Sequence, residues 1–131
     1  MSKVRGHMTS VVITVDENAT VKQACQMMNE EGVSGLFVTS ESGETGVFTD
    51  TDLLLLLSRG KPTDTKLKEV MSRDIFYVSP EASIKEAAEF IKANGVSRLF
   101  VSNNNSSGEK PEGIISVTDL IRALRDRLNF K

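Results

Sequence analysis

The chain has 131 residues, of which 39% are hydrophobic and 26% are charged, so it suits one soluble globular domain or two small paired units. Sixteen Lys and Arg against eighteen Asp and Glu give a net charge of −2, which argues against nucleic acid as the main partner because such binding depends on a basic face. The single cysteine excludes an internal disulfide, and no secretory signal or membrane-length apolar run is present, so we expect a cytoplasmic protein with no membrane contact.

The sequence repeats itself. Residues 8–38 match residues 71–101, and the offset from Met8 to Met71 is 63. From Gly46 onwards the offset to Gly113 is 67, because the second copy has four extra residues within 103–112, which we expect to form an exposed loop. We therefore predict two repeats, 1–60 and 61–131, that share a core, because so short a repeat buries little surface alone.

Each repeat predicts the order strand, helix, strand, strand, helix, which is a mixed α/β (α+β) fold. Residues 1–7 are a lead-in that aligns with 64–70 and is expected to pack on the other repeat. The expected strands are 11–15, 36–38, 46–48, 75–78, 99–101 and 113–115. The first helix of each repeat begins at a capping-box pair, Thr20 with Gln23 or Ser83 with Glu86. These helices end before Gly32 and Gly95, and the last helices cover about 49–57 and 116–128.

Both repeats end in the same pattern of a glycine, two apolar residues, a hydroxyl residue and an aspartate three places later. The hydroxyl and acid pairs are Thr49 with Asp52 and Ser116 with Asp119. One interpretation is a helix-capping device, since Ser and Thr are good N-cap residues. The other is a nucleotide site, because a helix N-terminus attracts phosphate and an aspartate can accept hydrogen bonds from the two hydroxyls of a ribose.

The element order, the repeat of about 60 residues and the duplicated ending resemble the cystathionine-β-synthase-type (CBS) domain. The resemblance covers nearly the whole chain, in both halves. It implies a pseudo-two-fold pair of units, known as a Bateman module, whose three-stranded sheets pack together and whose two clefts bind adenosyl ligands such as AMP, ADP, ATP or S-adenosylmethionine.

The resemblance also implies roles for individual residues. Asp52 and Asp119 match the ribose-binding acids of the family, and Thr49 and Ser116 match its phosphate-side hydroxyls. Four strand residues fall where the family encloses adenine, and two more open the second strand beside the cleft. The adenine-side residues are Ile13, Thr14, Phe76 and Tyr77, and the strand-opening residues are Gly35 and Arg98.

This chain departs from the family pattern at the position before each ribose acid. Many relatives have Arg or Lys there, whereas this chain has Thr51 and Thr118, so phosphate is neutralised less. Arg98 could supply a cation in the second copy, where the first copy has Gly35. One hypothesis is therefore that the clefts are unequal and that the one using Arg98 prefers phosphorylated ligands; the alternative is that Arg98 pairs with an acid on the surface.

Other candidates are weaker. His7 suits packing or solvent, and one His with one Cys makes no zinc-type ligand set. Cys25 falls on an apolar helical stripe and is expected in the core. Asp50 and Asp52 could contact a magnesium ion carried by ATP, but Asp50 aligns with Val117 and is expected to be solvated. Residues 53–57 are apolar all round their helix, which suggests cover by a second chain, and the family resemblance implies a homodimer.

The favoured interpretation is a non-catalytic sensor that needs no cofactor and whose adenosyl ligand regulates an unknown partner protein. No activated nucleophile or tuned acid–base pair is evident, so no catalytic residue and no metal site are assigned. A dimerisation or scaffold module with vestigial clefts is the alternative, supported by the missing basic residues at Thr51 and Thr118. Nucleic-acid binding is less favoured, because the chain is acidic.

Overall fold

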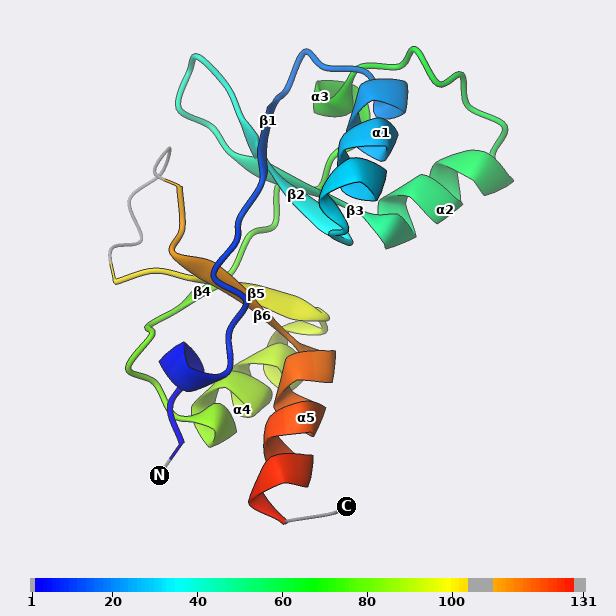
Figure 1. Ribbon diagram of the computed structural model, residues 1–131. Coiled ribbons are helices and arrows are strands. Elements are labelled where there is room, and N and C mark those ends of the chain that lie inside the picture. The colour runs from blue at the N-terminus through cyan, green and yellow to red at the C-terminus, as the bar shows by residue number, and fades with distance from the viewer. Residues whose placement is uncertain (1, 104–109, 129–131) are drawn as a thin grey trace. The chain divides into compact units, whose positions relative to one another are not determined.

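The computed structural model describes residues 2–103 and 110–128. These residues form a mixed α+β fold with two three-stranded sheets, and they divide into two compact units (Figure 1). The first-repeat unit consists of residues 13–75 with Lys110. The second-repeat unit combines residues 2–12, 76–103 and 111–128.

The first-repeat unit holds one three-stranded sheet and three helices. Strand β2 is central, with β1 parallel on one side and β3 antiparallel on the other. The elements are β1 (Thr14–Asp16), α1 (Val21–Glu31), β2 (Gly35–Thr39), β3 (Gly46–Thr49), α2 (Asp50–Ser58) and α3 (Leu67–Val70).

The second-repeat unit repeats this arrangement. Strand β5 lies between β4, which is parallel to it, and β6, which is antiparallel. The elements are the 3-10 helix η1 (Val4–Gly6), β4 (Tyr77–Val78), α4 (Ile84–Asn94), β5 (Arg98–Val101), β6 (Gly113–Ser116) and α5 (Val117–Arg127).

The predicted helix boundaries are confirmed. Thr20 and Ser83 form complete capping boxes at the starts of α1 and α4. Gly32 and Gly95 end these helices in the left-handed region, with φ of 65° and 62°, where a residue with a Cβ is strained. Local side-chain and glycine signals therefore determine where both helices begin and end.

The first strand of each repeat is shorter than predicted. The strand expected at 11–15 begins only at Thr14, and the one expected at 75–78 begins at Tyr77. The boundaries between the two compact units fall after Val12 and after Ile75. Residues 11, 12 and 75 lie on the far side of these boundaries and do not join the ladder, whereas Ile13 and Phe76 lie inside their units and each accept one hydrogen bond from the central strand.

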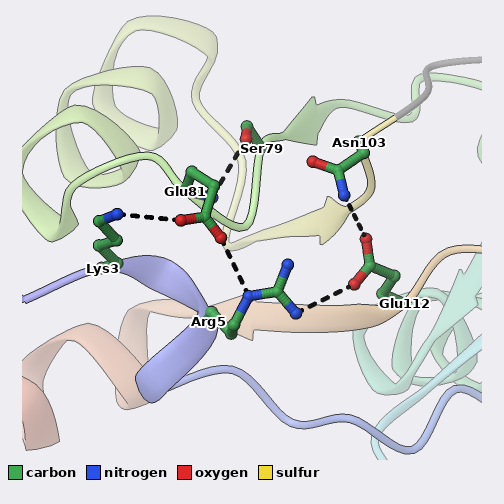
Figure 2. Close-up of polar contacts among 6 residues, drawn as sticks. All are labelled: Lys3, Arg5, Ser79, Glu81, Asn103 and Glu112. Carbon is green, nitrogen blue, oxygen red and sulfur yellow. Dashed lines mark hydrogen bonds and ion pairs between the residues drawn. The ribbon is translucent and has the colours of Figure 1, made fainter.

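The lead-in residues pack on the second repeat, as expected. The Val4 N–H donates to the Ala82 carbonyl at 2.8 Å, and Thr9 and Ile114 exchange two backbone hydrogen bonds of 2.8 and 2.9 Å. Side chains add to this attachment: Lys3 and Arg5 both contact Glu81, and Arg5 also reaches Glu112 (Figure 2). We call residues 2–9 the N-terminal arm.

The segment after α2 attaches to the first-repeat unit in the same way. The Leu67 N–H donates to the Ala19 carbonyl at 2.9 Å, and Val47 and Ser72 exchange hydrogen bonds of 2.8 and 3.0 Å. We call residues 65–72 the linker arm. It contains α3, a short helix that the sequence does not signal by a side-chain cap.

Each arm passes close to the glycine that opens the last strand. A Cβ on Gly46 would lie 2.6 Å from the Met71 sulfur and 2.9 Å from the Ser72 carbonyl oxygen. A Cβ on Gly113 would lie 2.7 Å from the Thr9 carbonyl oxygen and 2.9 Å from the Met8 sulfur. The glycine of the duplicated pattern is therefore needed for close contact between the strand and its arm.

Each unit has its own apolar core between the sheet and its helices. In the first-repeat unit, fully buried Leu36, Val38 and Phe48 contact α1 and α2. Leu99, Val101 and Ile115 occupy the same places in the second-repeat unit. Burying each such side chain stabilises the fold by about 1.5–3 kcal/mol.

Cys25 is not in the core, contrary to the expectation from the apolar stripe, because it is exposed on α1. The face of α1 that packs on the sheet carries Val21, Ala24 and Met28. Cys25 is the next residue after Ala24 and is rotated by about 100° around the helix axis, away from Ala24.

Among the described residues, no helix is both long and apolar enough to cross a membrane. The exposed loop expected at 103–112 falls largely at 104–109, which lie outside the described residues.

Candidate functional site

The N-terminus of α2 carries the first of the two duplicated caps. The Thr49 N–H donates to Asp52 Oδ2 at 2.8 Å, and the Thr49 hydroxyl lies 3.2 Å from the same oxygen. The Asp52 N–H donates back to the Thr49 hydroxyl at 3.4 Å. Aspartate is a short side chain for a capping box, yet the box is complete.

The N-terminus of α5 repeats this geometry. The Ser116 N–H donates to Asp119 Oδ2 at 2.9 Å, the two side chains are 3.0 Å apart, and the Asp119 N–H donates to the Ser116 hydroxyl at 3.2 Å. Asp119 is buried, with 8% of its surface exposed, whereas Asp52 is half-buried. The capping interpretation of the pattern is therefore correct in both copies, and in each copy one carboxylate oxygen is used by the cap.

The strand-opening residues lie directly beside the caps. Gly35 is the cross-strand partner of Thr49, and Arg98 is the cross-strand partner of Ser116. The chain before each strand also touches the helix, because the Asp50 N–H donates to the Ser34 carbonyl at 2.9 Å and the Val117 N–H donates to the Ser97 carbonyl at 3.0 Å. The cap and the strand start of each unit are thus joined by backbone pairing.

The adenine-side residues lie at the same end of each sheet. The Ile13 carbonyl accepts the Phe37 N–H at 2.9 Å, and Thr14 pairs with Phe37, two residues along β2 from Gly35. Because β1 and β2 are parallel and β3 is antiparallel, the starts of β1 and β2 and the end of β3 share one sheet end.

The second-repeat unit shows the same convergence. The Phe76 carbonyl accepts the Phe100 N–H at 2.9 Å, and Tyr77 pairs with Phe100, two residues along β5 from Arg98. The Phe76 ring meets Phe90 edge to face at 5.9 Å, and the Tyr77 ring is tilted against Phe100 at 6.2 Å. These two rings therefore have packing contacts within the unit. Within each unit, the structure gathers all five predicted site residues at one sheet end.

Two charged side chains make the caps unequal, and both were outside the predicted set. Asp50 Oδ1 accepts the Thr51 N–H at 2.8 Å, whereas the equivalent position in α5 is Val117. Arg122 donates to Asp119 Oδ1 at 3.3 Å, whereas its equivalent in α2 is Leu55. The sequence does contain a signal for the second contact, because residues three apart on a helix are neighbours.

The described residues contain no group of three or more His, Cys, Asp or Glu side chains that could hold a metal ion. His7 ends the 3-10 helix of the N-terminal arm, where its N–H donates to the Val4 carbonyl at 2.9 Å. The chemistry available at each cap is therefore hydrogen bonding by a hydroxyl, a carboxylate and backbone groups.

Comparison with known proteins places these caps in a wider family. The CBS domain model matches the chain twice, at residues 3–59 and 67–126. The CBS domain-containing protein YhcV of Bacillus subtilis (strain 168) is 29% identical over 121 residues, which is 92% of this chain and 84% of YhcV.

Solved structures show the same fold. The CBS domain pair of protein MJ0100, in complex with 5-methylthioadenosine and S-adenosyl-L-methionine, superposes with a TM-score of 0.83 at 18% identity and covers 97% of this chain and 98% of that one. The CBS domain protein PAE2072 from Pyrobaculum aerophilum, complexed with AMP, gives a TM-score of 0.80 at 17% identity, with 98% of each chain covered. The chain therefore belongs to the CBS domain family, with two CBS domains in tandem.

Proposed function

We propose that this chain is a non-catalytic regulatory module that binds adenosyl ligands, with AMP, ADP, ATP and S-adenosylmethionine as the candidates. In this proposal Asp52 and Asp119 each accept hydrogen bonds from the two hydroxyls of a ribose. Thr49 and Ser116 lie on the phosphate side, and the strand backbone at Ile13 and Phe76 lies on the adenine side. Magnesium takes part only if ATP brings it.

The observation that carries the proposal is the duplicated arrangement of the caps. In each unit a carboxylate, a hydroxyl and the ends of three strands lie at one sheet end, although the two units share few side chains there. Helix capping alone explains the carboxylate oxygen Oδ2 but not the convergence of the adenine-side and strand-opening residues. Two relatives with the same fold are described with AMP or with S-adenosylmethionine, which supports an adenosyl ligand here.

A calorimetric titration tests the proposal. Wild-type protein is titrated with AMP, ADP, ATP and S-adenosylmethionine, and then the Asp52→Ala and Asp119→Ala variants are titrated separately. Loss of a hydrogen-bonding acid costs about 1.5–3 kcal/mol, so each variant should bind roughly ten- to a hundred-fold more weakly at one site and normally at the other. Normal binding by both folded variants would show that the site assignment is wrong.

A second candidate function is dimerisation, and a separate surface favours it. An apolar groove of about 410 Å³ lies between α4 and α5, lined mainly by Ile84, Ala88, Ile91, Val117, Leu120, Ile121 and Leu124. Ile121 and Leu124 are 52% and 51% exposed on α5, and Leu54 and Leu57 are 67% and 66% exposed on α2. Such apolar helix faces are typical of contact surfaces, and we propose that a second copy of the chain covers them.

Light scattering tests this second function. Leu124→Arg should convert a dimer into a monomer, because the charge would be buried in the contact. Ala93→Arg, on an exposed part of α4 outside the groove lining, is the matched control and should remain dimeric. A wild-type protein that dimerises tightly but binds no adenosyl ligand would favour the scaffold function over the sensor.

A further inference from the structure

The two caps have the same hydrogen bonds but different charges around them. At three equivalent positions the second copy is more positive than the first: Arg98 replaces Gly35, Val117 replaces Asp50, and Arg122 replaces Leu55. All three positions lie at the cap. Arg98 is the cross-strand partner of Ser116, Asp50 is the first residue of α2, and Arg122 contacts Asp119. The three differences act in the same direction.

We infer that the two caps select ligands by charge. The Ser116 cap takes a phosphorylated adenosyl ligand, whereas Asp50 closes the Thr49 cap to phosphate and leaves it to an adenosyl ligand without phosphate. This inference rests on the function proposed above, and it assigns a specificity role to Asp50 and Arg122.

Asp50 occupies the position that a phosphate would need at α2. The first turn of a helix offers unpaired N–H groups and the positive end of the dipole, which is why anions bind there. In α2 the Thr51 N–H already donates to the Asp50 carboxylate at 2.8 Å, and the Asp50 N–H donates to Ser34. A phosphate at this cap would lose that donor and would face a like charge.

The α5 cap lacks this internal anion. The Val117 side chain offers no acceptor, so the contact between the Thr51 N–H and the Asp50 carboxylate has no counterpart at Val117 and Thr118. Arg122 adds a cation at the same carboxylate whose other oxygen contacts the Ser116 hydroxyl. The Arg122 side chain is 62% exposed, so it can turn toward an incoming phosphate, and the buried Asp119 carboxylate then keeps its hydrogen bonds from the Ser116 N–H and hydroxyl.

Exchanging the residues at this one position tests the inference in the full chain. Asp119→Ala isolates the Thr49 cap and Asp52→Ala isolates the Ser116 cap, and the probes are AMP and adenosine, which differ only by the phosphate. Asp50→Val combined with Asp119→Ala should tighten AMP binding at the Thr49 cap about tenfold. Val117→Asp combined with Asp52→Ala should weaken AMP binding at the Ser116 cap about tenfold. Adenosine affinity should stay within about twofold in both, because the ribose contacts are unchanged.

Asp50→Asn separates the effect of the negative charge from the effect of the hydrogen bond to the Thr51 N–H, because the amide oxygen can still accept that N–H while the side chain carries no charge. It should give most of the gain in AMP affinity, and it also serves if Asp50→Val folds poorly. An AMP-to-adenosine affinity ratio that none of these substitutions changes would overturn the inference while leaving the proposed function intact. If wild-type protein binds neither these probes nor ADP, ATP or S-adenosylmethionine, the proposed function fails, and this inference fails with it. If it binds S-adenosylmethionine but neither probe, the inference alone fails.

Discussion

Inside each of the two units, equivalent backbone hydrogen bonds attach the arm to the rest of that unit. Leu67 with Ala19 and Val47 with Ser72 in one unit correspond to Val4 with Ala82 and Ile114 with Thr9 in the other, and the distances agree within 0.2 Å. The caps of α2 and α5 agree within the same margin.

The charges differ where the backbone agrees. In the second-repeat unit, Lys3 and Arg5 of the N-terminal arm contact Glu81 at 2.9 and 3.0 Å (Figure 2). The equivalent residues of the linker arm are Lys66 and Lys68, and the position of Glu81 is occupied by Asn18. The two copies therefore keep the same main-chain framework and differ in the side chains that carry charge, at the arms as well as at the caps.

The largest effect should come from filling the contact between an arm and its glycine. Gly113→Ala should lower the free energy of unfolding by about 1–3 kcal/mol, because the new Cβ meets the Thr9 carbonyl oxygen at 2.7 Å. Gly46→Ala should cost somewhat less, because its backbone contact, to the Ser72 carbonyl oxygen, is longer at 2.9 Å and the Met71 sulfur at 2.6 Å belongs to a flexible side chain. Urea unfolding measures both.

Gly6→Ala is the control for these substitutions, since no heavy atom lies within 4 Å of its Cβ position. Its stability should stay close to that of wild type. Equal stability of Gly113→Ala and Gly6→Ala would mean that the arm does not pack closely on β6.

Removing the cap hydroxyls should have the next largest effect and should be equal in the two units. Thr49→Ala and Ser116→Ala should each destabilise the protein by about 1 kcal/mol, because each removes the acceptor of an N3 amide. Thermal unfolding compares the pair. A neutral Ser116→Ala beside a costly Thr49→Ala would show that the two caps are not equivalent in solution.

Arg122→Leu should have a small effect on folding and a selective effect on ligands. The ion pair with Asp119 is largely exposed on the arginine side, so the stability should change by less than about 1 kcal/mol. In the Asp52→Ala background, AMP affinity should fall about two- to fivefold while adenosine affinity is retained. Leu55→Arg in the Asp119→Ala background is the reciprocal variant and should strengthen AMP binding by a similar factor.

The smallest effect should be the pH dependence of the N-terminal arm. Hydrogen bonds from Lys3 and then from Arg5 lower the pKa of Glu81 below its usual value of 4.5. The stability from this contact is therefore fully present above pH 4.5 and is lost as the pH falls through the lowered value. Glu81→Gln should be less stable than wild type at pH 7, and the two melting curves should converge in acid. A difference that persists below pH 3 would contradict this origin.

The local parts of the fold follow from the sequence. The capping pairs at Thr20 and Ser83 and the left-handed glycines at 32 and 95 are local signals, and the structure bears them out because each cap is made by hydrogen bonds between residues three or four apart. The duplicated pattern likewise gives the cap geometry at Asp52 and Asp119. The assignment of these acids to a ribose remains a prediction that the titrations above must test.

The remaining differences have tertiary or side-chain causes. The first strands are short because the chain passes between units at Val12 and Ile75, which no local pattern marks. Cys25 is exposed because the sequence pattern of α1 does not show how many neighbouring apolar residues the buried face of the helix includes. The contacts of Asp50 and Arg122 depend on rotamers, so the sequence allows them but does not determine them.

The second-repeat unit combines the N-terminal arm with residues from 76 onwards, and this affects the order in which the two units can fold during synthesis. Almost all of the first-repeat unit is one continuous stretch, residues 13–75, so its sheet and helices can pair as soon as that stretch leaves the ribosome. Thr9 must instead wait for Ile114, which is 105 residues later, and closing so long a loop is slow. Until Ile114 has been synthesised, the nascent chain therefore carries a first-repeat unit that can fold and an N-terminal arm that has no strand to pair with.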